Sequence, residues 1–364
     1  MVASFPGQQY QNRCEECMRE IKALTGIRGL AAALVVCYHT MWVSTFKNGY
    51  LAVDMFFILS GFIMMTVYCD KFKDAVNGKE YALFMWNRVA RIYPVYALIT
   101  LITVLIAFFS GESFDIKRIA VNLSMLQSVG ISDSIVGPSW SISVEFIAYL
   151  TFPMIALITL RSQPARIMLL GLVIWFYYQL ATTPLYTKHG VLNVSQYYLN
   201  GPIIRGFCGF YLGVAIFFLR DIASGLNKTI ISIGQAIIFF GIIYCLLNRG
   251  LAIEYISLCA LFILSLYANE DGIMAKVMAW NPIFFLGKIS LSLYLVHLLV
   301  VMAVNPIKFR YPLYIFNPKV DPGVIILIVS ILVSAVLYKY VELPARERLK
   351  MIGRKAYKEA AINS

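Results

Sequence analysis

Long runs of apolar residues recur along almost the whole chain, and they limit the possible folds more than any other feature. A helix needs about 20 such residues to cross the ~30 Å hydrocarbon core of a bilayer. The sequence therefore predicts an all-α, polytopic membrane helix bundle of about ten transmembrane helices. The ten candidate spans are 27–46, 50–69, 92–110, 140–160, 167–183, 199–219, 229–247, 251–268, 283–304 and 323–341.

The composition agrees with a membrane protein and argues against other classes. Of the 364 residues, 60% are apolar and only 14% are charged, whereas soluble domains average about 45–50% and about 25%. These values exclude a disordered chain and disfavour a soluble enzyme. The net charge of +12 does not indicate a nucleic-acid partner, because the basic residues lie between the apolar runs.

The distribution of basic residues predicts the orientation of the chain in the membrane. If the N-terminus is cytosolic and the spans alternate, the cytosolic segments hold 22 of the 31 Lys and Arg residues. Cytosolic loops carry such an excess in membrane proteins, so we expect both termini to be cytoplasmic. Segment 79–91 is expected to form an interfacial amphipathic helix. The predicted domains are a cytoplasmic segment (1–21), a transmembrane domain (22–344) and a basic cytoplasmic tail (345–364).

Four ionisable side chains stand out inside the predicted spans, where charge is costly and usually functional. They are His39, Asp54, Glu145 and His297, and the predicted topology allows them to meet at one level in the middle-to-outer half of the membrane. Other interpretations remain open. A membrane histidine or glutamate can be a structural hydrogen-bond partner, Asp54 can compensate a helix dipole, and a His–carboxylate pair can relay protons in a transporter.

Three arginines form a basic cluster on the predicted cytosolic side. Arg88 and Arg91 are spaced i, i+3 and share a helix face, and Arg28 lies about 16 Å from His39 along its helix. Guanidinium groups bind phosphates in a bidentate manner, so the cluster suits an anionic ligand. The alternative is contact with anionic lipid headgroups. We expect no metal, because Cys14 and Cys17 lack a second ligand pair.

Six segments carry recognisable sequence motifs: Arg28–His39, Gly49–Phe62, Arg88–Pro94, Pro138–Glu145, Arg205–Gly213 and Gly287–His297. Arg28–His39 has the Arg-x10-His spacing, Arg88–Pro94 reads RxxRIxP, and Pro138–Glu145 is close to SWSLSVE. Together these segments resemble the integral-membrane acyltransferase-3 family, although Leu291 replaces the usual aromatic residue of the last one. No hydrolase-like domain is expected after the tenth span, unlike in some members of the family.

The resemblance implies a membrane O-acyltransferase that uses cytosolic acyl-CoA, most often acetyl-CoA, and a carbohydrate hydroxyl as acceptor. His39 would act as general base or carry the acyl group, and Glu145 or Asp54 would orient it, with His297 as a further catalytic residue. The phosphates of CoA would bind Arg28, Arg88 and Arg91. The residues expected to contact substrate or stabilise an oxyanion are Ser60, Trp140, Ser141 and Ser143.

The expected partners are the carbohydrate acceptor, acyl-CoA, membrane lipid and proteins of polysaccharide assembly, with no nucleic acid. The expected location is a bacterial inner membrane, with multiple passes. The main alternative is a polytopic transporter of a lipid-linked sugar or small anion, in which His39 and Glu145 relay protons. A purely structural membrane partner ranks last, because it does not need ionisable groups in four spans.

Overall fold

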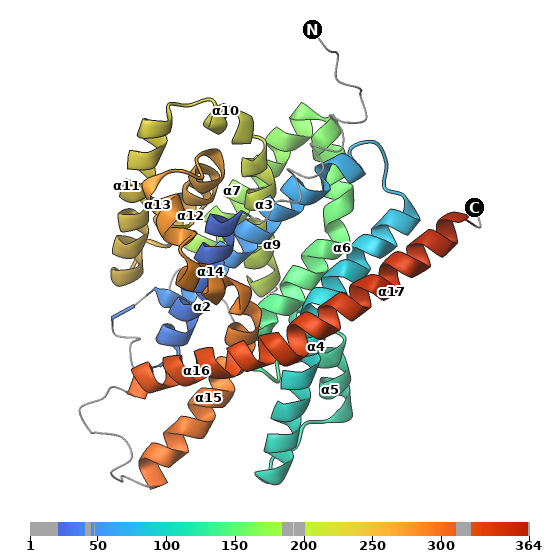
Figure 1. Cartoon of the computed structure of the whole chain (residues 1–364), viewed down its shortest axis with the longest axis vertical. Helices are drawn as coiled ribbons and strands as arrows, with labels where there is room; N and C mark the ends of the chain where they lie inside the picture. Colours follow the sequence, from blue (N-terminus) through green and yellow to red (C-terminus); the bar gives the residue numbers. More distant parts are fainter. Residues whose placement is uncertain are drawn as a thin grey trace.

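The computed structural model describes residues 21–40, 45–46, 48–183, 192, 201–310 and 322–362, and within these ranges the chain forms helices and no strand (Figure 1). The prediction of an all-α fold is confirmed for this part of the chain. The predicted segment 1–21 lies outside it, except for its last residue. The helices are α2 (Lys22–Tyr38), α3 (Ala52–Phe72), α4 (Gly78–Phe109), α5 (Ile116–Leu123), α6 (Trp140–Arg161), α7 (Gln163–Thr182), α9 (Gly201–Phe217), α10 (Arg220–Ser224), α11 (Lys228–Leu247), α12 (Ala252–Ala268), α13 (Ile273–Met278), α14 (Asn281–Lys288), α15 (Ser290–Arg310), α16 (Pro322–Leu337) and α17 (Leu343–Ile362).

Each of the ten predicted spans overlaps a helix, and the ninth overlaps two, but the helices differ in length. Six are long and apolar enough to cross a membrane, namely α3, α4, α6, α7, α11 and the helix that begins with α16. Helices α14 and α15 give a seventh span when taken together, although the chain bends by 73° between them. The other three, α2, α9 and α12, have 17 residues each, about 26 Å of helix. By length, the described residues thus contain six or seven full spans.

Helix α4 is longer than the sequence predicts. Segment 79–91 is not a separate interfacial helix, because it continues without a break into the third span to give a helix of 32 residues. The Asn77 side chain caps its start by accepting the Lys79 N–H at 2.9 Å. The helix is about 48 Å long, and Arg88 and Arg91 lie well inside it.

Glycines bring the central helices α3 and α9 into backbone contact. A Cβ atom at Gly61 would lie 1.8 Å from a carbonyl oxygen of α9, and one at Gly213 would lie 2.0 Å from a carbonyl oxygen of α3. Small residues permit such close approach between membrane helices, where van der Waals packing drives association. The contact fixes Asp54 and Ser60, both on α3, relative to Arg205 on α9.

The bend between α14 and α15 lies against the first described helix. A Cβ atom at Gly29 of α2 would lie 2.3 Å from the Gly287 nitrogen of α14, so these two helices also pack backbone to backbone. Gly287 comes directly before the bend and Ser290 directly after it. The bend therefore presents a carbonyl group and a hydroxyl group to α2 in the middle of the bundle.

Helices α16 and α17 are joined by a π-helical turn, Tyr338–Glu342, into one long arm. Figure 1 shows α17 running alongside α4. The Trp86 indole N–H of α4 donates to the Leu349 carbonyl at 2.6 Å, and a Cβ atom at Gly353 would lie 2.2 Å from the Trp86 ring. The segment predicted as a basic tail is thus a helix packed on the bundle.

Candidate active site

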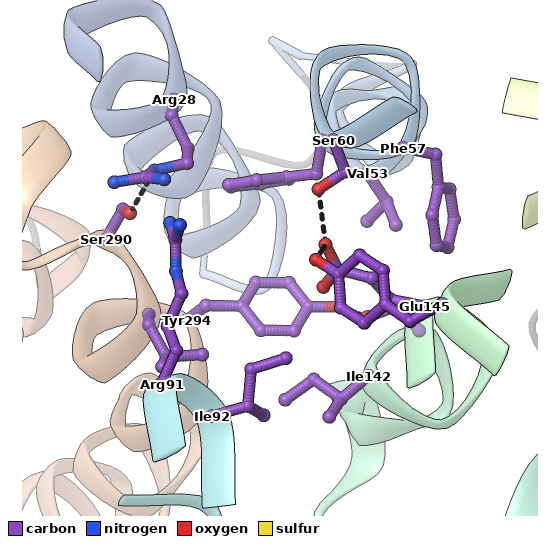
Figure 2. A pocket seen from close by; sticks show the side chains of 14 residues that line it. Arg28, Val53, Phe57, Ser60, Arg91, Ile92, Ile142, Glu145, Ser290 and Tyr294 are labelled. Atoms are coloured by element: carbon purple, nitrogen blue, oxygen red, sulfur yellow. Dashed lines mark hydrogen bonds between the residues drawn. The ribbon is translucent and has the colours of Figure 1, made fainter. Parts of the chain in front are cut away.

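A cavity lies between α2, α3, α4, α6 and the start of α15, and we call it the inner cavity. Figure 2 shows the Arg28 and Arg91 side chains at one end and Ser60 with Glu145 at the other, with Tyr294 between them. Water can occupy about 80 Å³ of it, so it is narrow. Its lining residues are Arg28, Val53, Phe56, Phe57, Ser60, Arg91, Ile92, Ser141, Ile142, Glu145, Tyr149, Ser290, Leu291 and Tyr294.

Glu145 accepts hydrogen bonds from two hydroxyl groups within the inner cavity. The Ser60 hydroxyl of α3 donates to Glu145 Oε1, and the Tyr149 hydroxyl, one turn further along α6, donates to the same oxygen at 2.5 Å. Glu145 is half-buried. Because both hydroxyl hydrogens are engaged with the carboxylate, the lone pairs of Ser60 and Tyr149 remain able to accept from a ligand.

Arg28 is held at the bend between α14 and α15. Its Nε donates to the Ser290 hydroxyl and its Nη2 donates to the Gly287 carbonyl, both at 3.0 Å. Arg91 of α4 faces the same cavity. Two of the three arginines that the sequence singles out therefore line one space.

Arg88 lies outside that space, although it shares a helix face with Arg91. Its guanidinium group donates to the Tyr68 hydroxyl at 2.9 Å, and its Cζ lies 5.4 to 5.9 Å from the ring centres of Tyr68, Phe84 and Tyr149. Only 8% of the residue is exposed. Such cation–π contacts stabilise a buried guanidinium, so Arg88 ties α4 to α3 and α6.

Replacing Arg88 with Ala should therefore lower stability. The variant loses a hydrogen bond from a charged donor and three ring contacts, which predicts a loss of about 2–3 kcal/mol. Thermal unfolding of the detergent-purified protein measures this as a lower Tm. Arg91→Ala serves as the control, because Arg91 is less buried and makes no hydrogen bond within the described residues. An unchanged Tm for Arg88→Ala would contradict the anchoring role.

Asp54 forms a buried ion pair with Arg205. Arg205 donates through Nη2 to Oδ2 at 2.6 Å and through Nε to Oδ1 at 3.0 Å. Asp54 is 0% exposed and Arg205 is 1% exposed. The Arg205 Nη2 also donates to the Tyr50 carbonyl at 3.0 Å. Asp54 thus contacts an arginine, and no contact between it and His39 is found.

The two histidines that the sequence singles out meet outside the inner cavity. His297 Nε2 lies 3.3 Å from His39 Nδ1, and the ring centres are 5.1 Å apart. His297 is 0% exposed, whereas His39, which follows the last residue of α2, is exposed. The expectation that the ionisable groups of the first and ninth spans lie at one depth therefore holds for this pair.

The hydrogen bonds of the pair determine which nitrogens carry protons. A carbonyl oxygen only accepts, so His297 Nδ1–H donates to Tyr294 O at 2.7 Å and His39 Nδ1–H donates to Val35 O at 2.9 Å. In the neutral rings, His297 Nε2 then presents a lone pair toward His39 Nδ1–H. The remaining nitrogen of His39, Nε2, carries a lone pair and can accept a proton.

Tyr294 separates the histidine pair from the inner cavity. Its hydroxyl lies 2.7 Å from the Ser141 hydroxyl and donates to the Pro138 carbonyl at 2.8 Å. Its ring centre is 5.8 Å from that of Phe56 and 6.2 Å from that of His297. Tyr294 therefore contacts both the cavity lining and the histidine pair.

Trp140 and Ser143, which the sequence also singles out, do not line the inner cavity. The Trp140 ring packs on Phe57 with centres 6.1 Å apart, and it lies 5.6 Å from the Arg205 Cζ. The Ser143 hydroxyl accepts the Ser128 N–H at 3.1 Å. Of the four predicted substrate-contacting residues, Ser60 and Ser141 face the cavity.

A second cavity adjoins the first, and we call it the vestibule. It shares Arg28, Arg91, Ser290 and Leu291 with the inner cavity, and water can occupy about 210 Å³ of it. The part of the chain that the structure describes contains no cluster of side chains suited to hold a metal ion. The full lining of the vestibule is Arg28, Arg91, Lys288, Ser290, Leu291, Tyr338, Glu342 and Arg346.

A family model described as an acyltransferase domain matches residues 21–339, which is most of the chain. The chain belongs to the acyltransferase-3 family. Membership in an acyltransferase family, together with several long apolar helices, makes the chain a multi-pass membrane protein. It also favours acyl transfer over the transport alternative considered from the sequence.

Two curated proteins illustrate the similarity of this acyltransferase-3 chain to known enzymes. The O-acetyltransferase OatA of Staphylococcus aureus (strain NCTC 8325 / PS 47) is 24% identical over 376 residues, covering 91% of this chain and 58% of that protein. The peptidoglycan O-acetyltransferase OatA of Listeria monocytogenes is 22% identical over 360 residues, covering 90% and 56%. The chain thus spans a little over half the length of these relatives. No solved structure matches it.

Several residues of the two cavities were not singled out from the sequence. Tyr149 and Tyr294 are two of many tyrosines in apolar runs. Only the structure shows that the Tyr149 hydroxyl contacts Glu145 and that the Tyr294 hydroxyl contacts Ser141. Lys288 and Arg346 were counted only as cytosolic charges. The sequence contains one indication that Arg346 faces the bundle. Tyr338, Glu342 and Arg346 follow one another at four-residue intervals, which places all three on one helix face.

Proposed function

We propose that this acyltransferase moves an acetyl group from acetyl-CoA, bound from the cytosol, to a hydroxyl group of a cell-surface or lipid-linked carbohydrate. One observation carries the proposal: a single narrow cavity joins two arginines, Arg28 and Arg91, to the carboxylate of Glu145 with its two hydroxyl partners. That arrangement suits a long ligand with phosphates at one end and a reactive acyl group at the other.

The arginine end would bind the donor. Guanidinium groups recognise phosphates through paired, charge-assisted hydrogen bonds. The hydrogen bonds of Arg28 to Ser290 and Gly287 hold its side chain in place before a ligand arrives, which reduces the entropy lost on binding. Arg88 would support the donor site indirectly, by holding α4.

The narrow part of the inner cavity would hold the pantetheine arm of CoA. This arm contains two amide N–H groups, and the hydroxyl oxygens of Ser60 and Tyr149 can accept from such donors while donating to Glu145. Glu145 would thereby act as a positioning residue for the donor. Its contacts with Ser60 and Tyr149 support this role better than the orientation of His39, which it does not touch.

Acyl transfer would take place at the histidine pair. His39 Nε2 would remove the proton of the acceptor hydroxyl as its oxygen attacks the thioester carbonyl carbon. The carbon–oxygen bond forms, the carbon–sulfur bond breaks, and the proton passes from His39 to the departing CoA thiolate. His297 would orient His39, as a carboxylate does in hydrolytic triads. The Ser141 hydroxyl, which donates to the Pro138 carbonyl at 3.1 Å, would turn to donate to the developing oxyanion.

Tyr294 would have to move for the thioester to reach His39. Its contacts with Phe56 and with His297 support this step, because one ring borders both spaces. A protein that separates donor from acceptor in this way would limit the transfer of acetyl groups to water.

The name of one relative suggests which class of acceptor to test. The OatA protein of Listeria monocytogenes is named a peptidoglycan O-acetyltransferase, so a peptidoglycan sugar is the first acceptor to test. We place the enzyme in a bacterial inner membrane, where acetyl-CoA is available on one side and cell-wall carbohydrate on the other.

Reconstitution tests the function directly. The full chain in liposomes, supplied with radiolabelled acetyl-CoA and soluble peptidoglycan fragments, should release CoA and place label in an alkali-labile ester on the sugar. Binding of acetyl-CoA without any acceptor-dependent release of CoA would refute carbohydrate transfer. Absence of acetyl-CoA binding by a folded sample would refute the donor.

Replacing Glu145 with Gln should lower turnover about 100-fold, because a misplaced thioester no longer lies in the geometry that the reaction needs. The amide keeps the size of the side chain but no longer offers a charged acceptor to Ser60 and Tyr149. Steady-state kinetics and acetyl-CoA binding should be measured together. Retained binding with lost turnover fits a positioning role, whereas a lower Tm without ligand would indicate a structural one.

A further inference from the structure

More cations than carboxylates line the vestibule. Arg28, Arg91, Lys288 and Arg346 line it, against the single carboxylate of Glu342. Arg91 and Arg346 form no ion pair with any residue that the structure describes. Both side chains are half-buried, and placing unpaired charge in a confined space is costly unless an anion joins it.

Three of the lining residues come from one face of the C-terminal arm. Tyr338, Glu342 and Arg346 are spaced at four-residue intervals, and the π-helical turn that ends at Glu342 sets this face toward the bundle. Such π-helical turns occur often at functional sites. The Ser292 hydroxyl donates to Glu342 Oε2 at 2.7 Å, which fixes the turn that leads to Arg346.

Lys288 reaches the vestibule from another element. It is the last residue of α14, at the bend that also holds Arg28, and its Nζ lies 4.6 Å from the Phe284 ring centre. Cations of α2, α4, α14 and α17 thus converge on one space, although they are far apart in the sequence.

We propose that the vestibule is the phosphate-binding site of the donor and that Arg346 and Lys288 bind the donor's phosphates together with Arg28 and Arg91. The proposal rests on the acyl-CoA donor argued above and adds two residues to the expected phosphate ligands, Arg346 and Lys288, of which Arg346 lies outside the sequence motifs. In this arrangement the donor occupies both the vestibule and the inner cavity. The phosphorylated nucleotide occupies the wider vestibule, and the pantetheine arm occupies the narrow inner cavity.

The charge of the vestibule indicates how many phosphates it takes. One phosphate monoester carries roughly −1.5 to −2 at neutral pH, whereas four cations and one carboxylate line the vestibule. A ligand with more than one phosphate can contact more of these cations, and CoA carries a diphosphate and a 3′-phosphate. A single-phosphate lipid headgroup shares the chemistry but brings less negative charge.

Substitution of Arg346 tests the proposal. The Kd of acetyl-CoA for the detergent-purified full chain should rise about tenfold or more in Arg346→Ala, because a charged hydrogen-bond donor to phosphate is lost. Lys288→Ala should act in the same direction. Arg346→Lys keeps the charge but not the bidentate geometry, so it should restore part of the affinity.

Arg348→Ala is the matched control, since Arg348 lies on the same helix but is exposed. It should bind acetyl-CoA as the wild type does, and Tm without ligand should be equal in both variants. Equal affinity in Arg346→Ala and Arg348→Ala would overturn the proposal while leaving the donor intact. The same holds if phosphatidylglycerol, and not acetyl-CoA, distinguishes Arg346→Ala from the wild type. A wild type that binds no acetyl-CoA would refute the proposed function itself.

Discussion

His39→Ala should lower kcat for acetyl transfer by about 10²- to 10⁴-fold, the usual contribution of a general base. His39 Nδ1–H is directed to Val35 and His297, so Nε2 is the nitrogen left to take the proton of the acceptor. The effect should appear in kcat, because His39 lines neither the inner cavity nor the vestibule, where the donor is proposed to bind. The measurement is acceptor-dependent release of CoA by the reconstituted protein.

Two readouts separate this catalytic role from a structural one. The Tm and the acetyl-CoA affinity of His39→Ala should equal those of the wild type, because the side chain is exposed and does not line the donor cavities. A well-folded His39→Ala protein that transfers acetyl groups at the normal rate would show that another group acts as the base.

Asp54→Ala should cause the largest loss of stability, about 3–5 kcal/mol. Removing the carboxylate leaves the Arg205 guanidinium buried at 1% exposure without its counter-charge. Denaturation of the purified protein in detergent micelles measures the change. Arg205→Ala should cost a similar amount, because it leaves Asp54 as the unpaired buried charge.

A double variant provides the control for this pair. Asp54→Leu combined with Arg205→Met removes both charges and fills the space, so it should be more stable than either single alanine variant. If it also retains acetyl transfer, Asp54 acts through the fold. A single Asp54→Ala variant with wild-type stability would contradict the structural role.

Features that depend on local sequence were predictable. Apolar length alone located a helix at each of the ten positions, because a membrane span must bury about 20 residues. The i, i+3 spacing of Arg88 and Arg91 also holds, since both lie on α4. The spacing did not reveal that the two side chains point in somewhat different directions around the helix axis. Arg91 therefore lines the two cavities, whereas Arg88 packs among three aromatic rings.

Pairings across the bundle were not predictable from one sequence. The predicted topology placed His39 and His297 at the same depth in the membrane. The depth of a residue does not determine which side chain of another helix it contacts. Asp54 was one of two carboxylates, with Glu145, expected to orient His39, and instead it contacts Arg205, which is 151 positions away in the sequence. The bend at Lys288 and the π-helical turn before Arg346 are local deviations from regular helices. The periodicity of apolar residues does not predict such deviations.

The composition of the vestibule has a consequence for biogenesis. Its cations come from the first described helix, from α4, from α14 and from the last described helix, so translation must have supplied all four before the site exists. If the vestibule binds acetyl-CoA as proposed, a partly inserted chain would lack that site. Acetyl-CoA would then bind only the fully assembled bundle and would stabilise it by mass action, so donor binding would favour the completed fold.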